Sequence, residues 1–404
     1  MSDENRISEI GKDGMREGTR CVTAGEAAHT AFNSITVPIF QNGAFEYDDI
    51  HEWIDVSLYR KPGDIYSRTT NPTVRAFEEK VAALEGAEDA TACSSGMAAI
   101  NNTLMCLLRP GDVAVSIKDT YGATYLHFAE ILPSFGIKTR ICETTDYSEI
   151  EKTISQGCNL VYLESPTNPT LKVVDIKRMT AAAKKVGALT VVDNTFATPI
   201  NQKPLELGAD LVIHSASKFL GGHSDVIGGV VCGSKELIRK IFLWRNLTGA
   251  CLSPNTAFLL IRGIKTLHLR MECHNRSAMK IAQYLQGHPK VTEVNYPGLP
   301  DHANHKIAAQ QMKGFGGVLS FALDGDFEDT GRFLSLLKYI HKAANLGQVD
   351  SVAGPPATTS HVECTPEERA AAGIPESLVR LSVGVEDTQD LIDDLENALD
   401  KYNQ

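Results

Sequence analysis

The stretch ADLVIHSASKFLGGHSDVIGG, residues 209–229, joins an apolar run to a lysine framed by small residues. The apolar run predicts a buried strand, which places Lys218 just past a strand end, where α/β proteins bind their ligands. A lysine that forms an imine must be partly desolvated, so that its amine is neutral and nucleophilic. Ser215 and Ser217 supply hydroxyl groups, and the glycine pair at 221–222 lets backbone approach a bulky group closely. We expect Lys218 to bond covalently to a phosphate-bearing cofactor; the alternative is a surface lysine after a turn.

A second interpretation uses the same residues. Ser215 and Lys218 stand three apart as S-x-x-K, the pairing found in serine acyl-enzymes. Those enzymes also need S-D-N and K-T-G elements further along the chain, and neither string occurs here. The sequence therefore disfavours a hydrolase.

Short apolar runs recur between residues about 88 and 232, each followed by a polar or glycine-rich turn. The runs are GDVAVSI, GIKTRICE, NLVYLES, LTVVDN, DLVIHS and VIGGVVCG, with a helical pattern in LKVVDIKRMTAAAKKVGA after the third. Strands alternating with helices predict an α/β fold, in which helices cover both faces of a mostly parallel sheet. A dinucleotide-binding fold would need G-x-G-x-x-G after a strand, and GFGGVLS from Gly314 fails that spacing.

The 404 residues are enough for two or three domains, and the pattern changes twice. Residues 1–65 show little periodicity, which predicts an arm that wraps a neighbouring subunit. Residues 66–262 form the predicted cofactor-binding domain. Residues 263–404 combine an amphipathic helix, RGIKTLHLRMECHNRSAMKIAQYLQ (262–286), the strand-like runs GGVLSFAL and SLVRLSVGV, and a closing helix DTQDLIDDLENALDKY, which predict a smaller α+β domain.

Composition excludes several classes of function. A net charge of −11 disfavours nucleic acid as a partner, and no apolar stretch is long enough to span a bilayer. The polar start of the chain is unlike a secretory signal, so we expect a cytoplasmic protein. Nine cysteines, Cys364 among them, include no C-x-x-C pair, which argues against a zinc site and against disulfides. His302 and His305 have the spacing of two metal ligands, but no further ligand cluster lies near them, and we expect no metal.

Three further segments suit a ring-shaped cofactor with a phosphate group. CSSGMAAINNTL places residues 94–97 at a helix start, where free N–H groups favour an anion. Asp193 in VVDNTF follows a strand and is positioned to keep a ring nitrogen protonated. Tyr121 in DTYGATY offers a face for stacking and a hydroxyl for proton transfer. Taken singly, these residues read as an N-cap, a turn residue and a core residue.

Arg380 lies in SLVRLSVGV, where the alternate residues 379, 381, 383 and 385 are apolar. Arg380 therefore points to the other side of a rigid strand, and its forked cation suits a carboxylate. The alternative is an arginine on an edge strand that forms a surface ion pair.

In the order of these segments and along nearly its whole length, the chain resembles the Cys/Met-metabolism family of pyridoxal-phosphate enzymes. This family includes cystathionine γ-lyase, cystathionine γ-synthase, methionine γ-lyase and O-acetylhomoserine sulfhydrylase. The resemblance implies pyridoxal 5'-phosphate as cofactor and the aspartate-aminotransferase fold, known as fold type I. It also implies a homotetramer built from two dimers whose subunits share active sites.

The resemblance assigns a role to each candidate residue. Lys218 carries the cofactor as an internal aldimine, Asp193 pairs with the pyridine nitrogen, and Tyr121 stacks on the ring. The residues expected to hold the phosphate end are Ser95, Gly96, Met97, Ser215 and Ser217, with Tyr66 and Arg68 of YSRTTNPT from an adjacent subunit. The residues expected to contact the substrate carboxylate are Asn168 in ESPTNP, Arg380 and Ser351.

The implied reaction is γ-elimination by way of an external aldimine. Lys218 removes and shuttles protons, and Tyr121 protonates the γ-group, which departs. Hydrolysis of the resulting unsaturated imine then gives a 2-oxo acid and ammonia. Capture by a nucleophile would instead give γ-replacement.

Departures from the family patterns bear on the substrate. Methionine γ-lyases carry a cysteine two residues after the stacking tyrosine, where this chain has Ala123. Asp350 stands where cystathionine enzymes generally have a glutamate, and a carboxylate there suits a cationic group at the far end of a substrate, as in cystathionine or canavanine. We expect a cystathionine γ-lyase-like enzyme. The alternatives are a canavanine γ-lyase, a γ-replacement enzyme, a methionine γ-lyase, and a catalytically silent cofactor-binding homologue.

Overall fold

The computed structural model describes residues 15–362, 365–371 and 373–404. The first fourteen residues of the predicted arm, and Cys364, lie outside this range. The chain contains two compact units. The first holds residues 15–107, 211–221 and 225–268, and the second holds residues 108–210, 222–224 and 269–404.

The strands form two sheets. The larger sheet has the strand order β1-β7-β6-β5-β4-β2-β3, and the smaller has the order β10-β11-β12-β9-β8. The strand bounds are β1 Asp89–Cys93, β2 Val113–Ile117, β3 Lys138–Cys142, β4 Leu160–Glu164, β5 Leu189–Asp193, β6 Leu211–Ser215, β7 Gly229–Gly233, β8 Val291–Asn295, β9 Val318–Leu323, β10 His341–Lys342, β11 Val352–Gly354 and β12 Leu378–Ser382.

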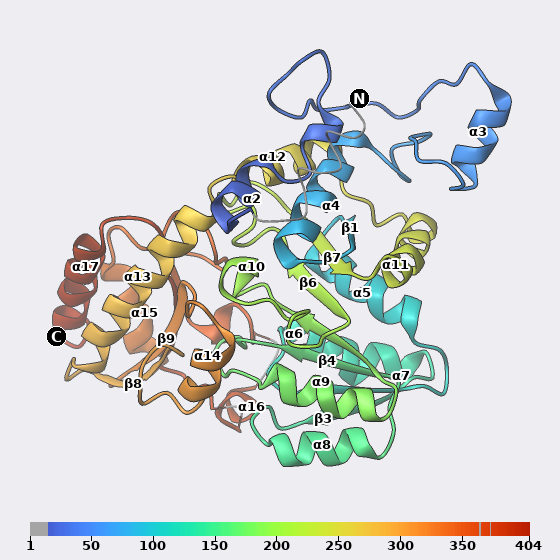
Figure 1. Cartoon of the computed structure of the whole chain (residues 1–404). Helices are drawn as coiled ribbons and strands as arrows, with labels where there is room; N and C mark the ends of the chain where they lie inside the picture. The colour runs from blue at the N-terminus through green and yellow to red at the C-terminus, as the bar shows by residue number, and fades with distance from the viewer. Residues whose placement is uncertain (1–14, 363–364, 372) are drawn as a thin grey trace. The chain divides into compact units, whose positions relative to one another are not determined.

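In the first unit, β7 pairs antiparallel with both β1 and β6. Its helices are α2 Glu17–Thr23, α3 Ile50–Ser57, α4 Pro72–Glu85, α5 Gly96–Leu107, α11 Lys235–Thr248 and α12 Pro254–Ile264, with the 3-10 turn η1 Ala27–His29. Helix α4 begins where the Asn71 side chain accepts the Thr73 N–H, and it ends at Gly86 with a φ of 74°. Part of the segment between η1 and α4 extends away from the rest of this unit, with α3 at its far end (Figure 1).

In the second unit, β2 pairs parallel with β3 and β4, and β4 pairs parallel with β5. Its helices are α6 Gly122–Leu126, α7 Leu132–Ser134, α8 Tyr147–Ser155, α9 Ile176–Lys185, α10 Thr198–Asn201, α14 His305–Gln311, α15 Phe327–Leu336, α16 Pro366–Ala371 and α17 Thr388–Lys401, with the π-helical turn η2 His127–Ile131 and the 3-10 turn η3 Pro356–Thr358. Helix α13, Leu267–Gln286, starts in the first unit and runs into the second.

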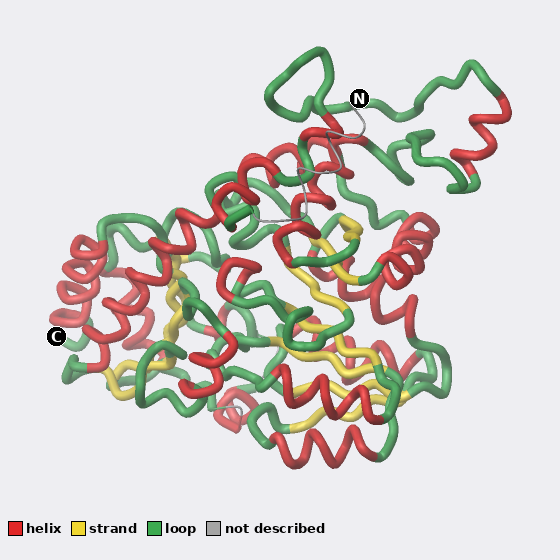
Figure 2. Tube along the Cα trace, viewed as in Figure 1, coloured by secondary structure: helices red, strands yellow, loops and turns green. Residues whose placement is uncertain are grey.

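The two largest apolar clusters described for the second unit pack against its strands. Val161 and Leu163 of β4 pack with Ile150 of α8 and Met179 of α9, and Figure 1 shows α8 and α9 side by side along these strands. The smaller sheet packs one face against helices α13, α15 and α17, drawn red beside the yellow strands in Figure 2. Every residue of β4 is buried, as expected for a strand covered on both faces.

The six strands predicted between residues 111 and 233 all form, and the two predicted later in the chain form as β9 and β12. The helix predicted over 262–286 is wrong in one respect, because it is two helices: α12 ends at Ile264 and α13 begins at Leu267. The Thr266 hydroxyl donates to the Gly263 carbonyl at 3.2 Å, and so competes for a carbonyl that a continuous helix would bond through its backbone.

Candidate active site

Lys218 lies in the turn that follows β6, as predicted. Strand β6 ends at Ser215, whose carbonyl accepts the Lys218 backbone N–H at 3.1 Å. Lys218 is half-buried. In the same turn, the Ser217 hydroxyl accepts the Gly228 N–H at 3.1 Å, so the turn is tied to the segment that leads into β7. The strand therefore fixes the lysine at a defined point on one edge of the sheet.

The start of α5 lies against this strand end. A side chain at Gly96 would place its Cβ 2.8 Å from the Cβ of Ser215, and one at Gly229 would meet the Ser95 carbonyl oxygen at 2.1 Å. The Ser95 hydroxyl accepts the Ala98 N–H at 3.0 Å and caps the first turn of the helix. Backbone N–H groups and serine hydroxyls therefore converge where a helix N-terminus favours an anion. This donor set fits a phosphate group. Met97 follows Gly96 and is half-buried.

Tyr66 and Arg68 are both exposed, and the Arg68 guanidinium lies 5.6 Å from the centroid of the Tyr66 ring. The Arg68 Nη1 also donates to the Asn246 carbonyl at 2.7 Å. Behind them, the buried guanidinium of Arg245 donates to the Thr69 carbonyl at 2.6 Å and to the Asn246 Oδ1 at 3.0 Å.

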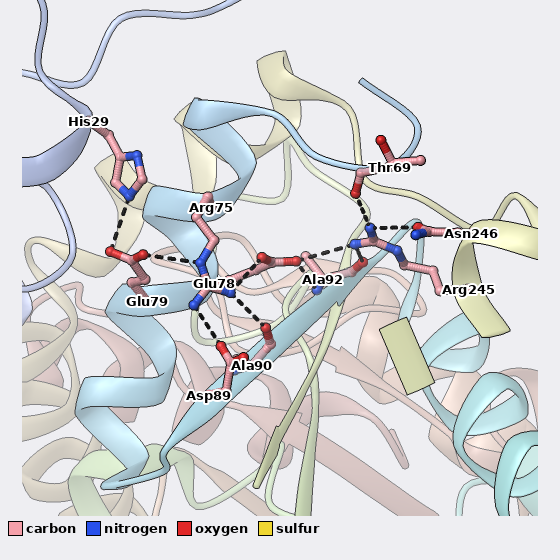
Figure 3. A network of polar contacts seen from close by, with 10 residues as sticks. All are labelled: His29, Thr69, Arg75, Glu78, Glu79, Asp89, Ala90, Ala92, Arg245 and Asn246. Atoms are coloured by element: carbon pink, nitrogen blue, oxygen red, sulfur yellow. Dashed lines mark hydrogen bonds and ion pairs between the residues drawn. The ribbon is translucent and has the colours of Figure 1, made fainter. Parts of the chain in front are cut away.

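This support is part of a wider polar network, shown in Figure 3. Arg245 forms an ion pair of 3.2 Å with Glu78, and Arg75 bonds to Glu78, Glu79 and Asp89 on the other side. The segment that carries the exposed residues Tyr66 and Arg68 is therefore held in place by this network within its own unit.

In the second unit, β4 and β5 end side by side, with Glu164 opposite Asp193. Asp193 is buried; its Oδ1 accepts the Thr195 N–H at 3.0 Å, and its Oδ2 accepts the Tyr162 hydroxyl at 3.4 Å. The Glu164 Oε2 accepts the Tyr121 N–H at 2.8 Å. Burial raises the pKa of Glu164 well above its usual value, and the Asp193 charge adds to the shift. The predicted strand-end position of Asp193 is confirmed.

Arg380 and Asn168 meet in the same unit. The Arg380 Nη1 donates to the Asn168 Oδ1 at 3.0 Å, and its Nη2 donates to the Asn345 carbonyl at 3.3 Å. Arg380 is only 6% exposed, and it forms no ion pair with any residue that the structure describes. Burial lowers its pKa to about 10, an effect that the neighbouring Tyr121 phenol opposes. The alternative of an edge-strand arginine is wrong, because β12 lies between β11 and β9.

Ser351 and Asp350 differ from each other. Ser351 is buried, and its hydroxyl donates to the Glu386 Oε2 at 2.8 Å and accepts the Gly384 N–H at 2.8 Å. Asp350 is exposed and makes no hydrogen bond with any described residue. Its neighbours are fixed, since the Ser351 N–H donates to Glu386 and the Val349 N–H donates to the Gly222 carbonyl at 2.9 Å. The Asp350 carboxylate therefore has no hydrogen-bond partner among the described residues, although the backbone on both sides of it is hydrogen-bonded.

The structure brings the candidates together as two groups, one in each unit. The first unit holds Ser95, Gly96, Met97, Ser215, Ser217 and Lys218, with Tyr66 and Arg68; the second holds Tyr121, Asn168, Asp193, Asp350, Ser351 and Arg380. Sequence reasoning missed Glu164, although its place at a strand end beside an aspartate was a usable signal. Between residues 15 and 404, the described residues contain no group of three or more potential metal ligands. His305 Nδ1 instead lies 2.9 Å from the Pro297 carbonyl.

Comparison with known proteins decides the family. A family model described as Cys/Met metabolism PLP-dependent enzyme matches residues 18–400. The chain belongs to this family. It is 43% identical to an L-methionine gamma-lyase of Fusobacterium nucleatum subsp. polymorphum, over 95% of this chain and 98% of that protein. It is also 43% identical to a cystathionine gamma-lyase of Bacillus subtilis (strain 168), over 96% of this chain and all of that protein.

The fold gives the same result. The chain superposes on a crystal structure of cystathionine gamma synthase from Xanthomonas oryzae pv. oryzae in complex with cystathionine, with a TM-score of 0.91 and 40% identity, over 96% of this chain and 99% of that one. The protein is therefore a pyridoxal-phosphate-dependent enzyme of fold type I, from a family of carbon–sulfur lyases and γ-synthases. None of its described helices is both long enough and apolar enough to cross a membrane.

Proposed function

We propose that the protein is a γ-lyase for a γ-substituted L-amino acid, similar to cystathionine γ-lyase. The observation that carries the proposal is the buried Arg380, which the Asn168 side chain orients and which has no acidic partner among the described residues. A buried cation without a carboxylate is costly unless an anion joins it. An amino-acid carboxylate fits the fork of its guanidinium.

Pyridoxal phosphate, when bound, supplies an electron sink that makes the substrate's α- and β-protons acidic. In this proposal Ser95, Gly96, Ser215 and Ser217 hold its phosphate end, and Asp193 holds its ring nitrogen. Lys218 anchors it and then moves protons at the substrate's α- and β-carbons.

Tyr121 stacks on the ring in this proposal, and its hydroxyl gives a proton to the departing γ-group. The Tyr121 phenol lies close enough to Arg380 to affect the pKa of the guanidinium, so it is near the proposed position of the substrate carboxylate. The Tyr121 backbone N–H donates to Glu164, and the residue is 45% exposed, so its side chain is accessible to a ligand.

Asp350 is proposed to select a cationic group at the far end of the substrate. Its carboxylate is exposed and without a hydrogen bond to the described residues, so the role of a mere turn cap finds no support. The second ammonium group of cystathionine is one such cation, and the guanidinium of canavanine is another.

A panel of substrates tests this function. Cystathionine, canavanine, methionine, O-acetylhomoserine and O-succinylhomoserine would each be given to the cofactor-loaded protein, with and without an added thiol. The proposal expects a 2-oxo acid and ammonia without thiol, and the highest kcat/KM for a cationic substrate. Product that forms only when thiol is present would favour the γ-replacement alternative. No product from any of the five would favour a silent homologue.

The homotetramer of two dimers that share active sites is likewise a proposal. It is supported by apolar side chains on the chain before α4, where Phe32, Ile35 and Trp53 are exposed in the single chain. Tyr66 and Arg68 are also exposed in this segment, which hydrogen bonds of Arg68 and Arg245 hold in place. A cytoplasmic location is our proposal from the sequence alone.

A further inference from the structure

Glu164 connects two parts of the second unit that carry candidate site residues. It is the last residue of β4 and is 5% exposed. Its Oε2 accepts the backbone N–H of Tyr121 at 2.8 Å, and its carboxyl group also receives a hydrogen bond from the backbone of Asn168. One buried carboxyl group thus fixes the main chain of two residues that stand 47 positions apart in the sequence.

Each of these two backbones leads directly to a side chain of the site. Tyr121 immediately precedes α6, so its N–H bond to Glu164 sets the point from which the ring projects. The Asn168 Oδ1 accepts the Arg380 Nη1 at 3.0 Å, so the main chain of Asn168 sets the orientation of the guanidinium. A shift of either backbone would move a group expected to meet the substrate.

The surroundings of Glu164 favour its neutral form. Its pKa is raised well above the usual value by burial first and by the charges of Asp193 and Asp119 next, while the two N–H donors oppose the rise. A protonated carboxyl group keeps its acceptor oxygens, so the neutral group can still receive both hydrogen bonds. Glutamine has nearly the same shape and keeps a carbonyl acceptor.

An ion pair that does not include Glu164 also joins the Tyr121 and Asn168 segments. The Lys172 Nζ lies 3.0 Å from the Asp119 Oδ2. Asp119 stands two residues before Tyr121, and Lys172 stands four residues after Asn168. The Thr167 N–H also donates to the Lys172 carbonyl at 2.9 Å. Because this ion pair remains when Glu164 is changed, we expect a local loosening and not a loss of the fold.

We propose that Glu164 is a positioning residue, whose carboxyl group holds the Tyr121 and Asn168 main chains and thereby aligns the stacking ring with the Arg380 guanidinium. The inference rests on the proposed function, in which Tyr121 and Arg380 meet the substrate. In this proposal Glu164 does not itself contact a ligand, since it acts through Tyr121 and Asn168.

The experiment compares four variants of the full-length protein. Glu164→Gln keeps the acceptor, Glu164→Ala removes it, and Glu164→Asp shortens it by one methylene. Glu151→Ala removes a carboxylate from α8 that pairs with Arg178 at 2.7 Å, and serves as the control. Two quantities are measured: kcat and KM for a γ-substituted amino acid, and hydrogen exchange of the Tyr121 and Asn168 amides in protein freed of cofactor.

We expect Glu164→Gln and Glu151→Ala to keep kcat/KM within about threefold of the parent, whereas Glu164→Ala lowers it by roughly tenfold to a hundredfold. In the alanine variant KM should rise, because the guanidinium is misaligned, and exchange of the two amides should become at least about tenfold faster. The kcat/KM of Glu164→Asp should fall between those of Glu164→Gln and Glu164→Ala. If Glu164→Ala does not fold, Glu164→Asp supplies the same comparison of KM and amide exchange.

A merely structural role predicts something different, since a smaller folded fraction lowers the apparent kcat and leaves KM unchanged. The proposal is overturned if both KM and the two amide exchange rates are unchanged in Glu164→Ala and Glu164→Asp. It is also overturned if Glu164→Gln is as impaired as the alanine variant, because the charge would then matter and not the acceptor. If the parent protein turns over no γ-substituted amino acid, the proposed function fails, and the amide exchange still decides the role of Glu164.

Discussion

At the scale of single residues, charges without partners mark the candidate site. Arg380 is a buried cation without an acidic neighbour among the described residues, and Asp350 is an exposed carboxylate on an anchored backbone. Some surface carboxylates in this chain do form ion pairs, as Glu236 does with Lys240 at 2.7 Å. An unpaired charge costs the free protein little when it is exposed, but it leaves a specific place for a charged ligand.

The first prediction concerns the carboxylate of Asp350. Asp350→Asn should lower kcat/KM for cationic substrates by roughly tenfold to a hundredfold, because one charge-assisted contact contributes about 1.5 to 3 kcal/mol. Neutral substrates should be spared. Steady-state kinetics with one cationic and one neutral γ-substituted amino acid make the comparison, and an equal fall for both would show that Asp350 only shapes the loop.

The positions of individual residues could be predicted from the sequence where a local pattern determines them. Lys218 and Asp193 follow apolar runs, so their positions at strand ends could be predicted from period and composition alone. The link between Arg380 and Asn168 could not, because the two residues are 212 positions apart and only the packed unit brings them together. Glu164 was missed although it ends an apolar run, because its partners are main-chain N–H groups, which no residue type identifies.

At the scale of elements, the close contact between α5 and β7 is the feature most sensitive to change. A Cβ at Gly229 would lie 2.1 Å from the Ser95 carbonyl oxygen and 2.9 Å from the Gly96 nitrogen. Both neighbours are backbone atoms at the start of a helix, so they cannot turn aside as a side chain would.

Gly229→Ala should therefore displace the start of α5, lower the free energy of unfolding by about 1 to 3 kcal/mol, and weaken cofactor binding. Gly331→Ala is the matched control, because Gly331 lies within α15 and a Cβ there meets no heavy atom within 4 Å. That control should be neutral or stabilising by up to about 1 kcal/mol. Denaturant unfolding measures the first effect and cofactor titration the second. Unchanged cofactor affinity in Gly229→Ala would refute the proposed phosphate site at the start of α5.

Most strands were predictable because β2, β4, β5 and β6 are short apolar runs between turn residues. The antiparallel pairing of β7 was not, since a sequence pattern carries no strand direction. The break between α12 and α13 was missed for a related reason. The apolar period continues across Lys265 and Thr266, where the Thr266 hydroxyl and backbone N–H both bond to the Gly263 carbonyl.

At the scale of the whole molecule, we propose that active sites are shared between subunits. Arg68→Ala should weaken cofactor binding, and Lys218→Ala should abolish turnover. In a mixed dimer of the two variants, one site carries both lesions and the other carries neither. Full random exchange should thus restore about a quarter of the parent activity. Activity that stays absent after confirmed subunit exchange would count against shared sites.

Reduction of the cofactor-loaded protein with borohydride, followed by peptide mapping, tests the central claim most directly. We predict that the reduced cofactor is found on the peptide that contains Lys218. Lys218→Ala should bind the cofactor only non-covalently and have no turnover, whereas a control at the exposed Lys152, Lys152→Ala, should behave like the parent. A covalent label on another lysine, together with normal activity of the Lys218→Ala protein, would contradict the claim.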